Sequence, residues 1–200
     1  MFQQDFLNRI KNALPIVYPT TTLPALGVIP TTEGLDHLFE LKKRDNLKIV
    51  SIAVAEFKQV TDLVQIPSYL EDFLEMFSPG SITTILEANE QLDSRLGGNW
   101  IAIRKVAHPT ARDLLEAVGP LTATSANLSG MEVKSHCDEA ASALGLPPQA
   151  AISELCPGGK PSTLIRCPVF LPLNDGQSLE IVREGVIHSE EVEHKWKALN

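Results

Sequence analysis

The sequence predicts an α/β fold, with a twisted, mixed β-sheet and helices packed against it in a single domain. The chain has 200 residues, of which 44% are hydrophobic, so it is long and apolar enough to build one sizeable core. Segments with helical periodicity alternate with short runs of β-branched residues, and neither a long linker nor an internal repeat separates them. Because the connections vary in length and some strands follow one another directly, we expect parallel and antiparallel pairs within one domain over residues 1–200.

The first half of the chain is predicted to alternate between helices and strands. Apolar residues at helical spacing, such as Leu35, Leu38 and Phe39, indicate helices, whereas a run rich in Ile and Val indicates a buried strand. Ser78-Pro79-Gly80 is a turn signal that ends the last of these helices. The expected elements are a helix at 6–14, a strand at 16–18, a helix at 32–44, a strand at 48–55, two helices separated by Pro67, and a strand at 81–87.

The second half of the chain is predicted to hold more strands than helices. Pro109 suits the first turn of a helix, and Gly119-Pro120 suits the end of the same helix. The expected elements are strands at 100–104, 121–124, 151–155, 162–167 and 179–183, and helices at 109–118, 137–144 and 190–199.

The overall charge excludes one class of partner. The 17 basic and 25 acidic residues give a net charge of −8, whereas a protein that coats RNA or DNA carries a basic surface. We therefore expect no broad nucleic-acid surface. Charged residues make up 21% of the chain, which argues against a disordered tail protein. A small anionic ligand remains compatible with this balance, because a few local cations are enough to hold it.

Cysteine usage and the N-terminus predict a soluble cytoplasmic protein. Cys137, Cys156 and Cys167 are odd in number and no pair has CxxC spacing, so the sequence contains neither a zinc motif nor a redox motif. The N-terminus lacks the apolar core of a signal peptide, and the most apolar run, at 49–55, is too short to cross a bilayer. Free thiols are expected, as in other proteins of a reducing compartment.

Familiar catalytic motifs are absent from the sequence. Gly158-Gly159-Lys160 is similar to the end of a phosphate-binding loop, but Glu154 stands where the first glycine belongs and Pro161 replaces the magnesium-binding Ser or Thr. His188 and His194 are six residues apart and so lie on different faces of a helix. There is no GxSxG nucleophile motif. We therefore predict no protein-bound metal site.

Short polar segments stand at the ends of the predicted strands. Taken singly, Ser, Asn and Gly after a strand usually form a turn, and a basic residue near a helix end complements the helix dipole. Together they supply hydroxyl groups and spaced cations where ligands bind in open α/β sheets, which suits a phosphate-bearing ligand. The segments are 18–22, 42–44, 103–104, 124–130, 161–163 and 182–185.

This ordered set resembles the YrdC/TsaC-type threonylcarbamoyl-adenylate synthases, over about residues 15–185. The string Thr124-Ser125-Ala126-Asn127-Leu128-Ser129-Gly130, which follows Gly119-Pro120-Leu121, is the most specific part of the resemblance. The other matching segments are Tyr18-Pro19-Thr20 with Thr22, Lys42 with Arg44, Ser78-Pro79-Gly80-Ser81-Ile82-Thr83, Arg104 before His108-Pro109, Ser162-Thr163, and Arg183 with Gly185. The resemblance implies a YrdC-like sheet around a concave, electropositive ligand cavity.

The resemblance also implies a reaction and its substrates. L-Threonine, bicarbonate or CO2, and ATP with Mg2+ would give threonylcarbamoyl-AMP and pyrophosphate, for the N6-threonylcarbamoyladenosine modification of tRNA. The tRNA threonylcarbamoyl-transfer complex is the implied partner, and no tightly bound metal or organic cofactor is expected. Holding the reactants together and neutralising phosphate charge would supply the catalysis, so no protein nucleophile is needed.

The functional residues of the family carry over one at a time. Lys42 and Arg44 are the implied catalytic residues, and Asn46 matches the family's Asn if two residues are deleted after Arg44. The implied ATP-binding residues are Arg44, Asn46, Ser125, Asn127 and Arg183, and the implied threonine-binding residues are Thr22, Arg104, Ala123 and Ser162.

Departures from the family pattern leave room for a changed substrate, or for an alternative to the synthase: a relative that binds a nucleotide or RNA without synthase activity. Thr21 replaces an acidic residue, and Pro24-Ala25 replaces Tyr-Gly. Under the same two-residue deletion, Ser51 takes the place of a threonine-contacting His, and Trp100 stands where a small Thr is usual near ATP. A plain interaction module is a third interpretation, but it leaves the clustered cations unexplained.

Overall fold

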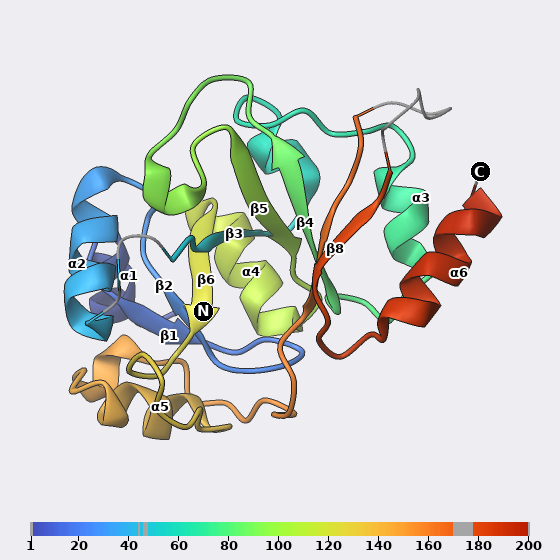
Figure 1. Cartoon of the computed structure of the whole chain (residues 1–200). Coiled ribbons are helices and arrows are strands. Elements are labelled where there is room, and N and C mark those ends of the chain that lie inside the picture. Colours follow the sequence, from blue (N-terminus) through green and yellow to red (C-terminus); the bar gives the residue numbers. More distant parts are fainter. Residues whose placement is uncertain (1, 44, 46–47, 170–177, 200) are drawn as a thin grey trace.

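The structure is a computed structural model that describes residues 2–43, 45, 48–169 and 178–199 (Figure 1). Its centre is an eight-stranded sheet with the strand order β1-β2-β6-β3-β5-β4-β7-β8. The pairs β3–β5 and β4–β7 are parallel and the other neighbours are antiparallel, which confirms the predicted mixed sheet. The strands are β1 (Ile16–Tyr18), β2 (Ala25–Gly27), β3 (Ser51–Val54), β4 (Ile82–Glu87), β5 (Trp100–Lys105), β6 (Leu121–Ser125), β7 (Thr163–Arg166) and β8 (Glu180–Arg183).

The helices cover the sheet in separate groups. Figure 1 shows α1 and α2 beside one end of the sheet, and α3 and α6 beside the other. The α-helices are α1 (Gln4–Lys11), α2 (Thr32–Lys42), α3 (Leu70–Glu75), α4 (Pro109–Val118), α5 (Cys137–Ala143) and α6 (Ser189–Leu199). The 3-10 helices are η1 (Phe57–Val60), η2 (Ser94–Leu96) and η3 (Pro148–Ala150).

Local sequence explains where α2 and α4 begin and end. The Thr31 side chain accepts a hydrogen bond from the Gly34 N–H at 3.3 Å, which caps the first turn of α2. Lys43 closes α2 in the left-handed region, with φ of 49°, so this helix stops at Lys42 and is shorter than predicted. Pro109 opens α4 and Gly119 follows its last residue, which confirms the predicted limits of that helix.

Buried apolar residues form two clusters. One includes Leu114 and Leu115 of α4, which pack with Ala53 of β3 and Leu121 of β6. The other includes Trp196 of α6, whose ring packs edge-on against the aromatic rings of α3 and the residue before it. The centroid distances are 5.4 Å to Tyr69 and 5.3 Å to Phe73. These contacts fix α6 on α3.

The strand predicted at 151–155 is wrong. Within this stretch the structure contains isolated bridges only, from Ala151 to Val17 and from Leu155 to His136. The segment turns from one partner to the other, so no ladder forms despite its apolar residues. Strand β2 was not predicted, because it is only three residues long and directly follows Pro24.

Two further predictions need correction in their limits. The first of the two helices separated by Pro67 is the short 3-10 helix η1, and the second, α3, stops at Glu75 before the Ser78-Pro79-Gly80 turn. The helix predicted at 6–14 runs from Gln4 to Lys11 and ends before Pro15. Among the described residues, no helix has the length and apolar character needed to traverse a bilayer.

Candidate active site

A cavity of about 600 Å³ lies over one face of the sheet. Side chains alternate along a strand, so every second residue of a strand reaches this face. The strand residues that line the cavity are Ala25, Ser51, Thr83, Ile85, Trp100, Ala102, Arg104, Ala123, Thr124, Ser125, Leu164, Arg166, Val182 and Arg183. Thr22 and Ser162 come from the loops before β2 and β7. Strands far apart in sequence therefore gather the predicted residues Thr22, Arg104, Ala123, Ser125, Ser162 and Arg183 around one space.

Arg104 forms the inner end of the cavity. Its side chain is 7% exposed, and its guanidinium donates to uncharged oxygens. Nη2 donates to the Thr22 hydroxyl at 2.9 Å and to the Gly80 carbonyl at 2.8 Å, and Nε donates to the same carbonyl at 3.1 Å. Two contacts to one carbonyl fix the plane of the guanidinium, so its orientation is set before a ligand arrives.

The turn at Gly80 is shaped for this contact. Gly80 has φ of 73°, a conformation that side chains rarely adopt. A Cβ atom there would lie 2.7 Å from the Thr21 hydroxyl and 3.2 Å from the Ala107 nitrogen. Any larger residue at position 80 would therefore displace the carbonyl that holds Arg104.

Ser162 and Arg183 form the wall next to Arg104. The Ser162 and Thr83 hydroxyls are 2.7 Å apart and both residues are buried. Arg183 Nη2 donates to the Ser162 carbonyl at 2.9 Å. Gly185 makes this crossing possible, because a Cβ atom there would lie 2.2 Å from the Pro161 carbonyl oxygen. The Arg183-x-Gly185 pair in the sequence thus has a geometric cause: the glycine lets two backbones meet and the arginine ties them together.

The electrostatics of the cavity favour an anion. Burial lowers the pKa of Arg104 to about 10 and also lowers the pKa of Arg183, and the positive charge of Arg183 further disfavours the charge on Arg104. None of the described residues that line the cavity is an aspartate or a glutamate. The positive charges of Arg104 and Arg183 therefore repel each other, and an anionic ligand in the cavity would offset this repulsion.

Lys42 supports the loop that follows β6. Its side chain is 1% exposed, at the last position of α2. Nζ donates to the Ser125 carbonyl, to the Asn127 carbonyl at 2.6 Å and to the Asn127 Oδ1 at 3.4 Å. Ser125 Oγ in turn donates to Asn127 Oδ1 at 2.6 Å. These contacts link Lys42, Ser125 and Asn127 into one unit at the cavity edge.

Two predicted residues, Arg44 and Asn46, lie outside the described residues. Of the described residues on either side of them in the sequence, Lys42 ends α2 and Ile49 lines the cavity. The roles predicted for Arg44 and Asn46, like those of the other site residues, remain predictions.

The positions that depart from the family pattern have defined surroundings. Ser51 Oγ donates to the Ala123 carbonyl at 2.7 Å and lines the cavity. The buried Thr21 hydroxyl has no hydrogen-bond partner among the described residues. Trp100 is 38% exposed and lies with its ring centroid 5.2 Å from the Arg166 guanidinium. Sequence reasoning missed Arg166, although alternation from Leu164 in a strand places position 166 on the same face.

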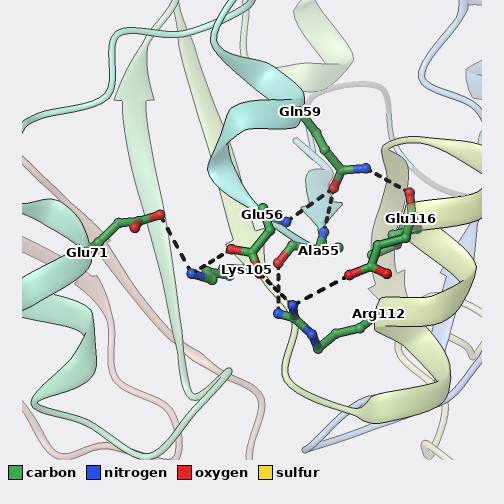
Figure 2. A network of polar contacts seen from close by, with 8 residues as sticks. Ala55, Glu56, Gln59, Glu71, Lys105, Arg112 and Glu116 are labelled. Carbon is green, nitrogen blue, oxygen red and sulfur yellow. Dashed lines mark hydrogen bonds and ion pairs between the residues drawn. The ribbon is translucent and has the colours of Figure 1, made fainter.

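Cations on the opposite face of β5, unlike Arg104, form ion pairs with carboxylates (Figure 2). Lys105 Nζ lies 2.8 Å from Glu56 Oε2 and 3.6 Å from Glu71 Oε1, and Arg112 Nη2 contacts both Glu56 and Glu116. A smaller cavity of about 220 Å³ lies beside this network and shares Gly80 with the surroundings of Arg104. Here every cation has a carboxylate, so the arrangement is that of a structural brace.

The described residues contain no group of His, Cys, Asp and Glu side chains with the arrangement of a metal site. Cys137, Cys156 and Cys167 are unpaired by disulfides and buried, as expected from the sequence.

Comparisons with known proteins point to a single family. The Sua5/YciO/YrdC family model, described as telomere recombination, matches residues 8–185. The threonylcarbamoyl-AMP synthase of Aliivibrio fischeri is 31% identical over 150 residues, which are 70% of this chain and 81% of the relative. The threonylcarbamoyl-AMP synthase of Vibrio campbellii is 27% identical over 190 residues, which are 91% of this chain and 98% of the relative.

Solved structures share the fold. P. abyssi Sua5, crystallised with L-threonine, matches 94% of this chain with a TM-score of 0.78 and 26% identity. This chain spans 55% of the length of that protein. E. coli YciO matches 93% of this chain, and 97% of its own, with a TM-score of 0.70 and 24% identity, which extends the likeness of fold.

Proposed function

The chain belongs to the Sua5/YciO/YrdC family, and we propose that it is an L-threonylcarbamoyl-AMP synthase. In the proposed reaction, L-threonine, bicarbonate or CO2, and ATP give threonylcarbamoyl-AMP and pyrophosphate. One observation carries the proposal: a buried arginine, held only by uncharged oxygens, faces a cavity whose described lining has no carboxylate. Such a site is suited to a carboxylate next to a phosphate chain.

The inner end of the cavity is the proposed threonine site. The Arg104 guanidinium would bind the threonine carboxylate, while the hydroxyls of Thr22 and Ser162 offer hydrogen bonds to its amine and hydroxyl. Thr22 already accepts from Arg104, and the Ser162 hydroxyl lies 2.7 Å from that of Thr83. Ala123 is small enough to leave room there, and Ser51 holds its carbonyl in place.

The loop after β6 is the proposed nucleotide site. Ser125 and Asn127 would bind the nucleotide, and Lys42 would keep the loop carbonyls turned away from the phosphates. Arg183, together with Arg44 and Asn46, would neutralise the phosphate chain. Mg2+ would enter with ATP and shield its phosphates.

The chemistry requires positioning and charge neutralisation. The threonine amine attacks CO2 and loses a proton, and a carbamate oxygen then attacks the α-phosphorus as pyrophosphate leaves. Arg104 would orient the amino acid at one end, and Arg183 would stabilise charge on the transferring group at the other. The product would supply the threonylcarbamoyl group for tRNA modification, with the transfer complex as the acceptor of the adenylate.

The test is a direct assay. The protein is incubated with ATP, MgCl2, labelled bicarbonate and L-threonine, and both pyrophosphate and a labelled acyl-adenylate are measured. Equal amounts of both products, dependent on threonine, are expected. Binding of ATP without either product at high enzyme concentration would contradict the proposal and favour a binding protein without synthase activity.

A further inference from the structure

The cavity has two distinct ends along β5. Arg104 and Trp100 face the same side of this strand, four residues apart, which corresponds to about 13 Å. The Arg104 end is buried and polar, whereas the Trp100 ring is 38% exposed. A ligand whose charged amino-acid part lies at Arg104 would therefore extend along the strand toward Trp100.

The loop that we assign to the nucleotide lies at the Trp100 end. In the sheet, β3 pairs with β5 in parallel and with β6 in the antiparallel sense. Ser51 of β3 pairs with Ala123 of β6, and the next residue of β3, Ile52, pairs with Ile103 of β5. Continuing both registers toward the start of β3 brings Ser125 level with Trp100. The indole and the Ser125 loop thus frame the same end of the cavity.

The surroundings of Trp100 form a platform. Arg166 of β7 lies against the indole, with its guanidinium 5.2 Å from the ring centroid, and Nη1 donates to Glu180 at 2.9 Å. Arg166 Nε is buried and has no partner among the described residues. The cavity lining that the register places nearest to this end is apolar, with Ile49, Ile85 and Ala102. A large aromatic ring, fixed by a cation and bordered by aliphatic side chains, is a surface for a flat aromatic ligand.

We propose that Trp100 stacks on the base of the nucleotide and that stacking area sets the base preference, purine over pyrimidine. The inference rests on the proposed function, which places ATP in this cavity. Stacking recognises the face of a base rather than its edge, so adenine and guanine would be held similarly. Arg166 is a positioning residue that keeps the indole in its orientation, while Glu180 balances its charge.

The two tryptophans make the proposal directly measurable. The chain contains two tryptophans, Trp100 in the cavity and Trp196, which is 8% exposed and packed on α3. In a Trp196→Phe protein, the fluorescence reports Trp100 alone. Titration with ATP or GTP should quench it with similar affinity, and CTP should bind roughly tenfold more weakly. L-Threonine alone should leave the signal unchanged.

Variants and an independent binding measurement complete the test. Calorimetry should show that Trp100→Thr weakens ATP binding roughly tenfold, while Trp100→Phe retains most of the affinity. Arg166→Met should weaken ATP less than Trp100→Thr does. Leu155→Thr is the matched control, since Leu155 is 69% exposed and does not line the cavity. This control should bind ATP as the unchanged protein does.

The outcomes separate this inference from the function it rests on. If ATP binds by calorimetry while the Trp100 signal stays constant and Trp100→Thr binds equally well, the stacking inference is overturned and the synthase proposal stands. If CTP binds as tightly as ATP, the base preference is overturned. If the unchanged protein binds no nucleotide at all, the proposed function fails first, and the stacking inference fails with it.

Discussion

Arg104 and Lys105 are consecutive residues of β5 with opposite surroundings. Arg104 faces the large cavity and donates to the Thr22 hydroxyl and the Gly80 carbonyl, and burial lowers its pKa to about 10. Lys105 faces the other side and meets two carboxylates. Burial disfavours its charge too, but the hydrogen bond with Glu56 and the nearby negative charges raise its pKa overall.

The difference separates a cation that we propose binds a ligand from a cation that stabilises the fold. A buried charge without a counter-ion costs stability, and that cost is tolerated where a ligand supplies the missing charge. A charge paired with carboxylates contributes modestly to stability and leaves nothing for a ligand to bind. Four substitutions or conditions can break this contrast, and their expected effects decrease in the order given.

Arg104→Met should give the largest effect. Removing the cation that would hold the threonine carboxylate should lower kcat/KM for threonine on the order of 100-fold, because a charged contact in a buried site is lost. Tm should change little, because relief of a buried charge without a counter-ion offsets the loss of its hydrogen bonds to the Thr22 hydroxyl and the Gly80 carbonyl. Pyrophosphate release and calorimetric unfolding measure the two quantities. A large fall in Tm would mean that Arg104 stabilises the fold.

Lys42→Met tests a third kind of cation, one buried against backbone carbonyls. Its loss would leave the Ser125 and Asn127 carbonyls without their charged donor, which should lower the free energy of unfolding by about 1–3 kcal/mol. The KM for ATP should rise more than the KM for threonine, because the loop belongs to the nucleotide end. Denaturant unfolding and steady-state kinetics check this. An equal rise in both KM values would contradict the assignment of the loop.

Lys105→Met should lower stability and leave catalysis nearly unchanged, which is the opposite of the effects expected for Arg104→Met. Among the described ion pairs, the change leaves Glu56 paired only with Arg112, so the free energy of unfolding should fall by about 1 kcal/mol or less, as for partly exposed ion pairs. The kcat/KM should stay within about twofold of that of the unchanged protein, because Lys105 does not line the large cavity. The same two assays apply. Loss of activity comparable to that of Arg104→Met would erase the contrast between the two faces.

Acidic pH should weaken the brace by a still smaller amount. Hydrogen bonds from Lys105 and Arg112 lower the pKa of Glu56 below its ordinary value of 4.5. Its contribution to stability is therefore fully present above pH 4.5 and is lost as the pH falls through the folded-state pKa. Glu56→Gln should flatten this part of the stability–pH curve by about 1 kcal/mol or less. Unfolding from pH 7 to pH 3, with Glu116→Gln as a control, measures the difference.

Sequence patterns predicted the elements where local rules suffice. Pro109 and Gly119 mark the ends of α4, and three adjacent apolar residues mark β1, so both were predicted correctly. The stretch 151–155 has comparable apolar character but changes partner midway, which only the tertiary structure reveals. Strand β2 pairs with β1 and with β6, but its three residues, Ala25-Leu26-Gly27, are too few to leave a local signal of their own.

Sequence reasoning named several residues that line the large cavity, but it did not predict how they are arranged there. The alternation of side chains along β5 puts Arg104 and Lys105 on opposite faces of the sheet, but the sequence does not indicate which face borders the large cavity. The carbonyl of Gly80, which holds Arg104, has no side-chain signature. Arg166 was missed for a related reason, because its value lies in the contact with Trp100 across β4.

The strand order also limits when the sheet can form during synthesis of the chain. The central strand β3 lies between β6 and β5, and four of the seven strand pairings, β2–β6, β3–β6, β3–β5 and β4–β7, join strands that are not consecutive in the sequence. Such topologies fold slowly, because loops must close before contacts repay their entropy. Arg183, which closes the cavity wall, is synthesised after every other residue that lines the cavity. The cavity would therefore lack this wall until β8 has been synthesised, and during that interval the exposed strand edges would be accessible to chaperones.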